Sequence, residues 1–573
     1  MRLFADSLRA AVAAAARVPA ADVRIEAPRD EKQGDLAVPC FVLAKARGVP
    51  PPALAAEIAA ALGPGGAHAV PEVTAAATGP YVNFRIARPA LARAVFAEIA
   101  AAGARYGGSD EGASKRVVID FSSPNIAKPM HVGHIRSTIL GASLMRIFRH
   151  LGYTAVGINH IGDWGAQFGG LVVAIRRWKH EVDLEREPVR GLLELYQRSK
   201  AAVEGDPAFR DEAVAAYQEL ESGREGEVRE TWRWVTAVSM RGFDATYRRL
   251  GITHDFVRGE SFYEPLLEPT VKRIVDAGVT EISQGALIVD LAKVDKGLAK
   301  TPCLLRQTNG TTLYATRDLA ALFHRHEEFR FERALYVVGA EQKLHFRQLK
   351  AVLKRLGSPW EPRVEHVEFG LLLGKDKKKL ASRKGDVLVL DDLLDEVVEE
   401  STRIVKEKNA NLAAPERVAE QIGIGAIVFN DLKRERIKDV LFDREDILSF
   451  EGETGPYLQY THARLASIER KARDAGEGGA EPDWSKLSDA AAVLGRLGRF
   501  PDVVRSAADH AEPSEIANAL LALGRDLNTW YVQARVLGQE PAVTAARLAL
   551  VRASKSVIGN GLRLLGCAAP DEM

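Results

Sequence analysis

The chain has little cysteine, no long apolar run and almost no net charge. Its cysteines are far apart and form no C-x-x-C pair, so neither a zinc site nor a disulfide framework is expected from Cys40, Cys303 and Cys567. No stretch of about 18 uninterrupted apolar residues occurs, which argues against a membrane span. Lys and Arg total 78 and Asp and Glu total 77, so overall charge does not indicate nucleic-acid binding. A local basic surface can still bind phosphates.

The amino terminus is not typical of an exported protein. Residues 1–19 are rich in alanine, but Asp6 and three arginines interrupt them, and no clear cleavage site follows. An amphipathic first helix is the better interpretation. Together with the scattered cysteines, it favours a reducing, cytoplasmic location.

Hydrophobic periodicity divides the chain into three parts. Residues 1–106 are mainly helical in pattern and end in a strand-like run, which predicts a small α+β domain. Residues 115–404 alternate between strand and helix patterns, which predicts a parallel-sheet α/β domain with insertions. Residues 405–573 are helical throughout with no convincing strand, which predicts an all-α bundle.

The middle part opens with a parallel βαβ unit. A buried strand is expected at 117–121, a helix up to residue 151 and a second strand at 153–158. Residues 180–250 are charged and helical, so we expect a helical insertion there. Strand patterns return at 334–339 and 364–373.

The loop between the first strand and its helix carries the most informative residues, SSPNIAKPMHVGH at 122–134. In an open α/β sheet, ligands bind at the carboxyl ends of strands, where helix N-termini point free N–H groups. His131 and His134 are three residues apart, so both can reach one phosphate from one helical turn. Gly133 lets a nucleotide lie close to the backbone. Taken alone, the four residues HVGH at 131–134 also fit two surface histidines beside a turn. A metal site is a poorer interpretation, because no third ligand is evident.

The thirteen-residue stretch as a whole resembles the ATP-binding signature of class I aminoacyl-tRNA synthetases. Its particular sequence is similar to that of their arginyl branch. The resemblance implies a Rossmann-like catalytic domain that uses ATP with Mg²⁺ and no zinc. It also implies L-arginine and tRNA(Arg) as partners, no membrane association and a monomer. His131 and His134 would act on the α-phosphate and the transition state. The ATP-binding residues implied are Ser123, Pro124, Gly133, His134 and His345.

A basic loop at 374–385 resembles the mobile lysine-serine loop of the same family, but the match is degenerate. It ends in KLASRKG, and the second lysine of the family pattern falls on Ser382. Lys128 and Arg383 are expected to supply the missing charge, and Lys384 to help neutralise the leaving pyrophosphate. A solvated basic loop is the alternative interpretation.

The segment LYATRDLA at 313–320 suits recognition of arginine. A guanidinium carries five donors and needs carboxylates in a fixed geometry. Tyr314 and Asp318 are four residues apart and face the same way on a helix. The stretch resembles the arginine-recognition motif of the arginyl family, and the resemblance adds Asp120, Asn125 and Gln342 as substrate contacts. Taken singly, Tyr314 also fits a core position and Asp318 a surface charge.

Three further stretches resemble tRNA-contacting parts of arginyl enzymes. FEGETGPYLQYTHAR at 450–464 resembles the entry to their anticodon-binding bundle, where aromatic side chains stack on unpaired bases and arginines meet phosphates. Helix packing is the alternative role for those aromatics. GDLA at 34–37 and GPYVNF at 79–84 resemble the domain that contacts the tRNA elbow.

The predicted activity is ATP-dependent joining of arginine to the 3′ end of tRNA through an arginyl-adenylate. A cysteinyl enzyme would need zinc ligands that this chain lacks, and a glutamyl site would favour arginines over Tyr314 and Asp318. The long helical carboxyl-terminal part disfavours a small nucleotidyltransferase. A non-catalytic, tRNA-binding relative stays open because the second loop is degenerate.

Overall fold

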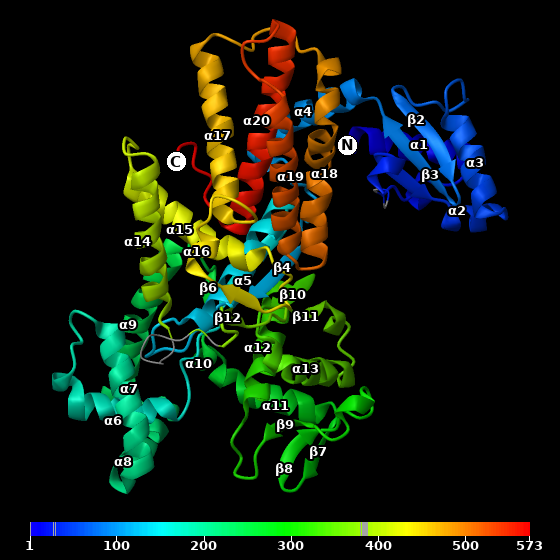
Figure 1. Cartoon of the computed structure of the whole chain (residues 1–573). Coiled ribbons are helices and arrows are strands. Elements are labelled where there is room, and N and C mark those ends of the chain that lie inside the picture. Colours follow the sequence, from blue (N-terminus) through cyan, green and yellow to red (C-terminus); the bar gives the residue numbers. More distant parts are fainter. Residues whose placement is uncertain (1, 27, 29, 379, 381–387) are drawn as a thin grey trace.

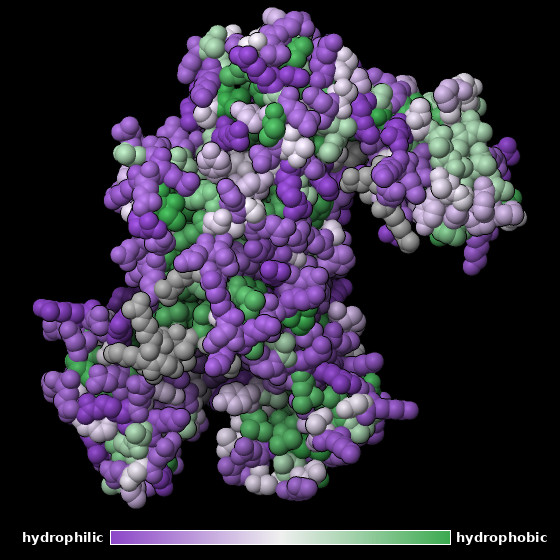
Figure 2. Space-filling model, viewed as in Figure 1, coloured by the Kyte–Doolittle hydropathy of each residue, from purple (hydrophilic) through white to green (hydrophobic). Residues whose placement is uncertain are grey.

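A computed structural model describes residues 2–26, 28, 30–378, 380 and 388–573. Figure 1 shows a central sheet between an upper helical bundle and two lower lobes, with the amino-terminal unit projecting to one side. Figure 2 shows a hollow between the two lower lobes.

The central sheet is parallel and has the strand order β11-β10-β4-β5-β6. Val118 lies opposite Val156 on one neighbouring strand and Ala334 on the other. All three are buried, as expected for a strand covered on both faces. The predicted βαβ unit is therefore confirmed. The elements are β4 (Arg116–Asp120), α5 (Val132–His150), β5 (Thr154–Asn159), β6 (Phe256–Val257), β10 (Arg333–Tyr336), β11 (Val364–His366), α12 (Tyr314–Phe329) and α13 (Lys343–Arg355).

Two insertions form the lower lobes (Figure 1). The first lies between β5 and β6 and is helical as predicted, with α6 (Gln167–Trp178), α7 (Pro188–Gly205), α8 (Pro207–Glu221) and α9 (Glu227–Arg249). The second holds an antiparallel sheet that the periodicity did not predict, because its strands are too short for alternation to show. Its elements are α10 (Glu260–Tyr263), α11 (Leu267–Asp276), β7 (Thr280–Ser283), β8 (Ala286–Val289) and β9 (Cys303–Arg306).

The strand predicted at 364–373 is wrong as a single element. Strand β11 belongs to the central sheet, whereas β12 (Leu372–Gly374) pairs in parallel with β13 (Val440–Phe442). The break lies at Gly370, where an added Cβ would meet Asp439 and the neighbouring backbone at 2.8 Å. The expectation of no strand after residue 405 is also wrong. A strand of three residues is too short to show an alternation of apolar and polar residues. Strand β13 forms only because β12 pairs with it.

The amino-terminal unit is α+β, as predicted, with the sheet order β1-β3-β2. Strand β2, which pairs with β3 in a hairpin, has the sequence VTAAAT. It was not predicted, because alanine has little strand preference. The elements are α1 (Arg2–Ala16), β1 (Leu36–Pro39), α2 (Phe41–Arg47), α3 (Pro51–Leu62), β2 (Val73–Thr78), β3 (Tyr81–Ile86) and α4 (Arg88–Ala102).

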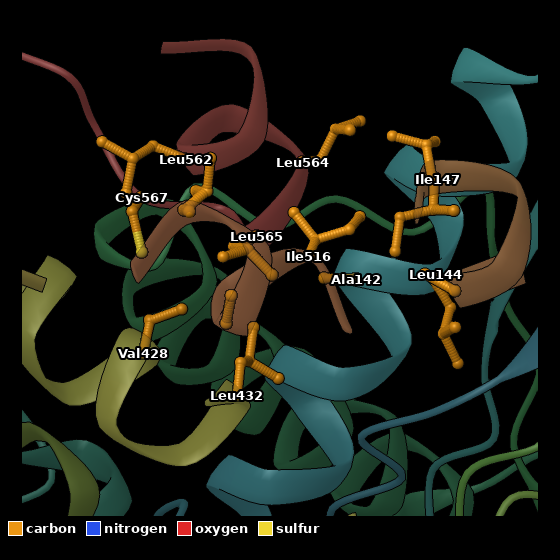
Figure 3. Packing of buried hydrophobic residues seen from close by; sticks show 14 of the residues in the cluster. Ala142, Leu144, Ile147, Val428, Leu432, Ile516, Leu562, Leu564, Leu565 and Cys567 are labelled. Carbon is orange, nitrogen blue, oxygen red and sulfur yellow. The ribbon is translucent and has the colours of Figure 1, made fainter. Parts of the chain in front are cut away.

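The carboxyl-terminal bundle packs directly on helix α5. In Figure 3, Ala142 of α5 lies beside Ile516 and Leu565 of the bundle, and all three belong to one buried hydrophobic cluster. A buried ion pair of 2.9 Å joins Arg136 of α5 to Asp431. The helix that carries the histidine signature is thus held by the bundle, whose helices are α14 (Leu390–Lys408), α15 (Pro415–Leu432), α16 (Arg444–Ile447), α17 (Gly455–Asp474), α18 (Ala491–Asp509), α19 (Ser514–Gln533) and α20 (Pro541–Leu565).

Candidate active site and tRNA-facing surfaces

The histidine signature lies at the carboxyl end of β4, in a loop with an unusual backbone. Ser122, Ser123 and Ala127 have φ values of 77°, 53° and 63°, although none is glycine. The loop persists because neighbouring side chains hold its backbone. Ser137 Oγ accepts from the Ser122 N–H at 2.9 Å, and Asn159 Oδ1 accepts from the Ser123 N–H at 3.1 Å.

His131 and His134 cap the first turn of α5, and their ring centroids are 3.8 Å apart. His134 Nδ1 accepts from the His131 N–H, and His131 Nδ1 accepts from the Gly133 N–H, both at 3.0 Å. A ring nitrogen that accepts a hydrogen bond carries no proton, so in each neutral imidazole the proton is on Nε2. The two rings therefore offer Nε2–H donors to a ligand at the helix N-terminus.

Both histidines are neutral at physiological pH. Burial, with the charge of Lys128 second, lowers the pKa of His131. Burial first, and then the neighbouring His131, lowers the pKa of His134 to about 3. The pair thus supplies hydrogen bonds without charge, and the positive charge of Lys128 acts on both rings.

Glycine at 133 makes room for a histidine ring. An added Cβ would lie 2.8 Å from the His131 imidazole, which packs over this position. Asn125 is exposed, and its Oδ1 lies over Gly162, where a Cβ would meet it at 1.9 Å. The Pro124 carbonyl accepts from the Gly162 N–H at 3.0 Å. The loop after β5 therefore supports the signature loop.

Asp120 is buried and already paired. Its Oδ2 accepts from Arg325 Nη1 at 2.7 Å, and its Oδ1 accepts from Ser123 Oγ at 3.1 Å. Arg325 is only 1% exposed. The sequence reasoning missed this arginine, although it lies two helical turns after Asp318 on α12 and so on the same face.

Asp318 meets His345 across α12 and α13, at 2.5 Å from Oδ2 to Nε2. His345 was expected to contact ATP, and the structure places it beside the arginine-recognition aspartate. Tyr314 is 69% exposed, which excludes the core alternative for it. Gln342 is also exposed, at the end of a short 3-10 helix before α13.

The sequence reasoning also missed Glu260, at the start of α10. Burial raises the pKa of its carboxyl to about 7; Arg317 opposes this shift, while Asp163 and Asp318 add to it. The carboxyl groups of Asp163 and Asp318 therefore lie close enough to act on that of Glu260. No sequence motif marked Glu260, because only the tertiary fold brings α10 to α12.

The second phosphate loop is described only at its edges. Arg383 and Lys384 lie outside the described residues. Before them, Lys375 forms an ion pair with Asp443. After them, the Val132 N–H donates to the Leu388 carbonyl at 3.1 Å, and the Leu390 N–H donates to Met130 at 2.9 Å. The chain that leaves this loop is therefore attached to the histidine signature.

The bundle carries an aromatic pocket of about 350 Å³. Its lining includes Phe450, Tyr457, Tyr460, Arg464, Trp530 and Tyr531. The Arg464 guanidinium lies 4.0 Å from the centroid of the Tyr531 ring. Tyr460 is 47% exposed and Trp530 only 4%, so the packing alternative holds for some of these aromatics and not for others.

The amino-terminal unit exposes apolar side chains on its surface (Figure 2), among them Phe41 at 51% and Val42 at 70%. Tyr81 packs edge-on against Phe41. Asp35 of the GDLA stretch is structural: its carboxylate accepts from the Ile86 N–H and from Arg88, both at 2.8 Å.

A parallel sheet with a capped histidine pair at the end of one strand, two inserted lobes and a helical bundle defines a class I aminoacyl-tRNA synthetase. Residues 96–444 match the model of the class I (R) tRNA synthetase catalytic domain, residues 458–573 the DALR anticodon binding domain, and residues 2–86 the arginyl tRNA synthetase N terminal domain. The chain belongs to the arginyl-tRNA synthetase family.

Relatives match the chain over nearly all of its length. An arginine–tRNA ligase of Bacillus cereus is 42% identical over 96% of this chain and 95% of its own length. One of Lactococcus lactis subsp. cremoris is 41% identical over 100% and 99%. The arginyl-tRNA synthetase structure of Thermus thermophilus has a TM-score of 0.82 at 27% identity and covers both chains fully.

Within the described ranges, no three or more His, Cys, Asp and Glu side chains gather in a group that could hold a metal ion. The helices of the same ranges include none long and apolar enough to cross a membrane.

Proposed function

We propose that the site at the carboxyl ends of β4, β5 and β10 activates arginine with ATP and transfers it to tRNA. Membership of the family makes the chain an ATP-dependent aminoacyl-tRNA ligase that acts with arginine in protein synthesis. The observation that carries the residue assignment is that the site combines hydrogen-bond donors with carboxylates. Neutral N–H donors stand at one end of the site, and carboxylates at the other.

The first step needs no general base, because the carboxylate of arginine is already ionised. One of its oxygens attacks the α-phosphorus of ATP, a new P–O bond forms, and the bond to the β-phosphate oxygen breaks to release pyrophosphate. Positioning and charge stabilisation provide the catalysis. The Nε2–H groups of His131 and His134 donate to the α-phosphate, and Lys128, Arg383 and Lys384 with Mg²⁺ neutralise the leaving group.

Recognition of arginine falls to the carboxylate end. Asp318, Tyr314 and Glu260 contact the guanidinium, and Asp120, Asn125 and Gln342 contact the ammonium and carboxylate. Glu260 ionises fully when the guanidinium enters, because a nearby cation lowers the pKa of a carboxyl. Lysine is rejected because its single ammonium leaves buried acceptors unpaired.

ATP contacts extend along the loop after β4, through Ser123, Pro124 and Gly133. His345 contributes to the ATP site only if it leaves Asp318. In the second step, a hydroxyl of the terminal ribose of tRNA attacks the arginyl carbonyl and AMP leaves. The aromatic pocket of the bundle binds anticodon bases, and the apolar surface of the amino-terminal unit contacts the tRNA elbow. We further propose a cytoplasmic monomer.

The test is charging of total tRNA with labelled arginine, ATP and Mg²⁺, with lysine and glutamate as controls. Arginine-only charging is the expected result. Charging with another amino acid would overturn the roles of Asp318 and Tyr314. Binding of tRNA with no charging would point to a non-catalytic relative.

A further inference from the structure

The first inserted lobe contacts the histidine-signature loop at three places. Ser122 Oγ lies 2.7 Å from Tyr247 Oη on α9. The Ala127 N–H donates to Ser239 Oγ, also on α9, at 2.9 Å. The Lys128 ammonium lies over the Tyr196 ring of α7, 4.1 Å from its centroid. The lobe is therefore part of the support of the ATP site.

Two of these contacts hold backbone that is costly to form. Ser122 and Ala127 are left-handed, with φ values of 77° and 63°. Such residues persist only where the surrounding structure over-determines them. Lys128 follows Ala127 directly. The lobe therefore positions both the backbone that carries the Lys128 side chain and the ammonium group at its end.

An aromatic face is an unusual partner for a lysine beside a phosphate site. It attracts an ammonium through the ring quadrupole and leaves its charge intact. A carboxylate partner would compete with the phosphates for the same charge. Within the part of the chain that the structure describes, no Asp or Glu forms an ion pair with Lys128. The charge of Lys128 acts on the histidine signature, since it helps to lower the pKa of both His131 and His134.

The Tyr196 ring is partly buried and packs against the main hydrophobic core. It lines a pocket of about 290 Å³ between α6, α7 and α8, together with Ala166 and Val203. A lysine side chain is long and flexible, so on its own its ammonium would sample many positions. Contact with a ring that packs against the core reduces that freedom before ATP arrives.

We propose that Tyr196 is a positioning residue for Lys128, whose ammonium its ring face holds ready for the phosphates of ATP. The inference rests on the role proposed for Lys128. It also assigns the first inserted lobe a part in catalysis, although the lobe carries none of the residues of the signature.

The test compares Tyr196→Phe, which keeps the ring face, with Tyr196→Leu, which removes it. Charging is measured with the full chain, tRNA, arginine and Mg²⁺ at varied ATP. Tyr196→Phe should stay within about twofold of the wild type, whereas Tyr196→Leu should lower kcat/KM for ATP about 3- to 30-fold. The KM for arginine should not change.

The matched control is Tyr153→Leu, which removes a ring that lies 5.9 Å from Lys115 at the amino end of the same central sheet. It should leave kcat/KM for ATP within about twofold of the wild type. Thermal unfolding checks that each variant folds. Should Tyr196→Leu unfold, Tyr196→Met replaces it as a ring-free side chain of greater length.

The decisive readout is the double variant with Lys128→Met. If Tyr196 acts through Lys128, Tyr196→Leu adds no further loss once the lysine is gone. Additive losses, or equal damage from Tyr196→Phe and Tyr196→Leu, would overturn the inference. An unchanged rate in Lys128→Met alone would instead refute the proposed role of Lys128. A slow Lys128→Met beside a fully active Tyr196→Leu would refute the positioning role alone.

Discussion

The phosphate end and the arginine end of the site are prepared for their ligands in opposite ways. At the phosphate end, hydrogen bonds to Nδ1 fix both histidines, and no residue that the structure describes accepts a hydrogen bond from their Nε2–H groups. At the arginine end, Asp120 is paired with Arg325, and Asp318 with His345. An unpaired neutral donor costs less than an unpaired carboxylate that is taken out of water. In the protein without substrate, carboxylates of the arginine end are therefore paired with other side chains of the same chain.

The largest effect expected from this comparison is a requirement for tRNA. Pyrophosphate exchange with arginine and ATP should be almost absent without tRNA, because the arginine end is occupied in the free protein. Periodate-oxidised tRNA, which cannot accept arginine, should restore exchange if binding alone rearranges that end. Exchange at full rate without any tRNA would show that the internal pairs are no obstacle.

Removal of the Asp318 carboxylate should affect only the arginine end. Asp318→Ala should raise the KM for arginine about 10- to 100-fold, the range of a lost hydrogen bond to a charged group. The KM for ATP should change less than twofold. Asp276→Ala, which removes an exposed carboxylate paired with Lys272, is the control. Equal effects on both KM values would refute the assignment of Asp318.

Loss of a histidine should affect only the phosphate end. His134→Ala should lower kcat at least about tenfold, or ~1.4 kcal/mol of barrier, with little change in the KM for arginine. The exposed His180 provides the control substitution His180→Ala. An unchanged kcat would return the pair to a purely structural capping role.

The smallest effect concerns pH. The pKa of His134 is lowered from 6.5 to about 3, so as pH falls below 6.5 the unfolded chain binds a proton that the folded chain does not. Stability is therefore lost as pH falls from 6.5 toward 3. His134→Asn should lose about 1–2 kcal/mol less than the wild type between pH 7 and 5, measured by urea unfolding. His510→Asn, at an exposed histidine, is the control. An identical acid loss in His134→Asn and the wild type would contradict the burial of a neutral ring.

Much of the fold was predictable because its signals are local. The buried run of β4, the capped helix α5 and the strand β5 follow one another within a short stretch, and all three were predicted. The helical lobe and the helical bundle have strong periodicity. Strands β7, β8, β12 and β13 have three or four residues each and were missed or misplaced, because pairing partners and not their own sequence make them strands. The domain boundaries remain predictions.

The candidate site divides in the same way. The sequence alone determined the chemistry on offer: a histidine pair at a helix start, a lysine beside it, and a tyrosine and an aspartate one helical turn apart. These properties depend on spacing along one segment, which the helical repeat converts into geometry.

Only the tertiary structure decided which of those groups are free. It paired Asp120 with Arg325 and Asp318 with His345, brought Glu260 beside the arginine end, and placed Tyr196 under Lys128. Each of these contacts joins different helices, strands or loops, either within the central domain or between it and an inserted lobe. Burial then sets the protonation of the histidines and of Glu260, because the cost of a charge depends on everything that excludes water from it.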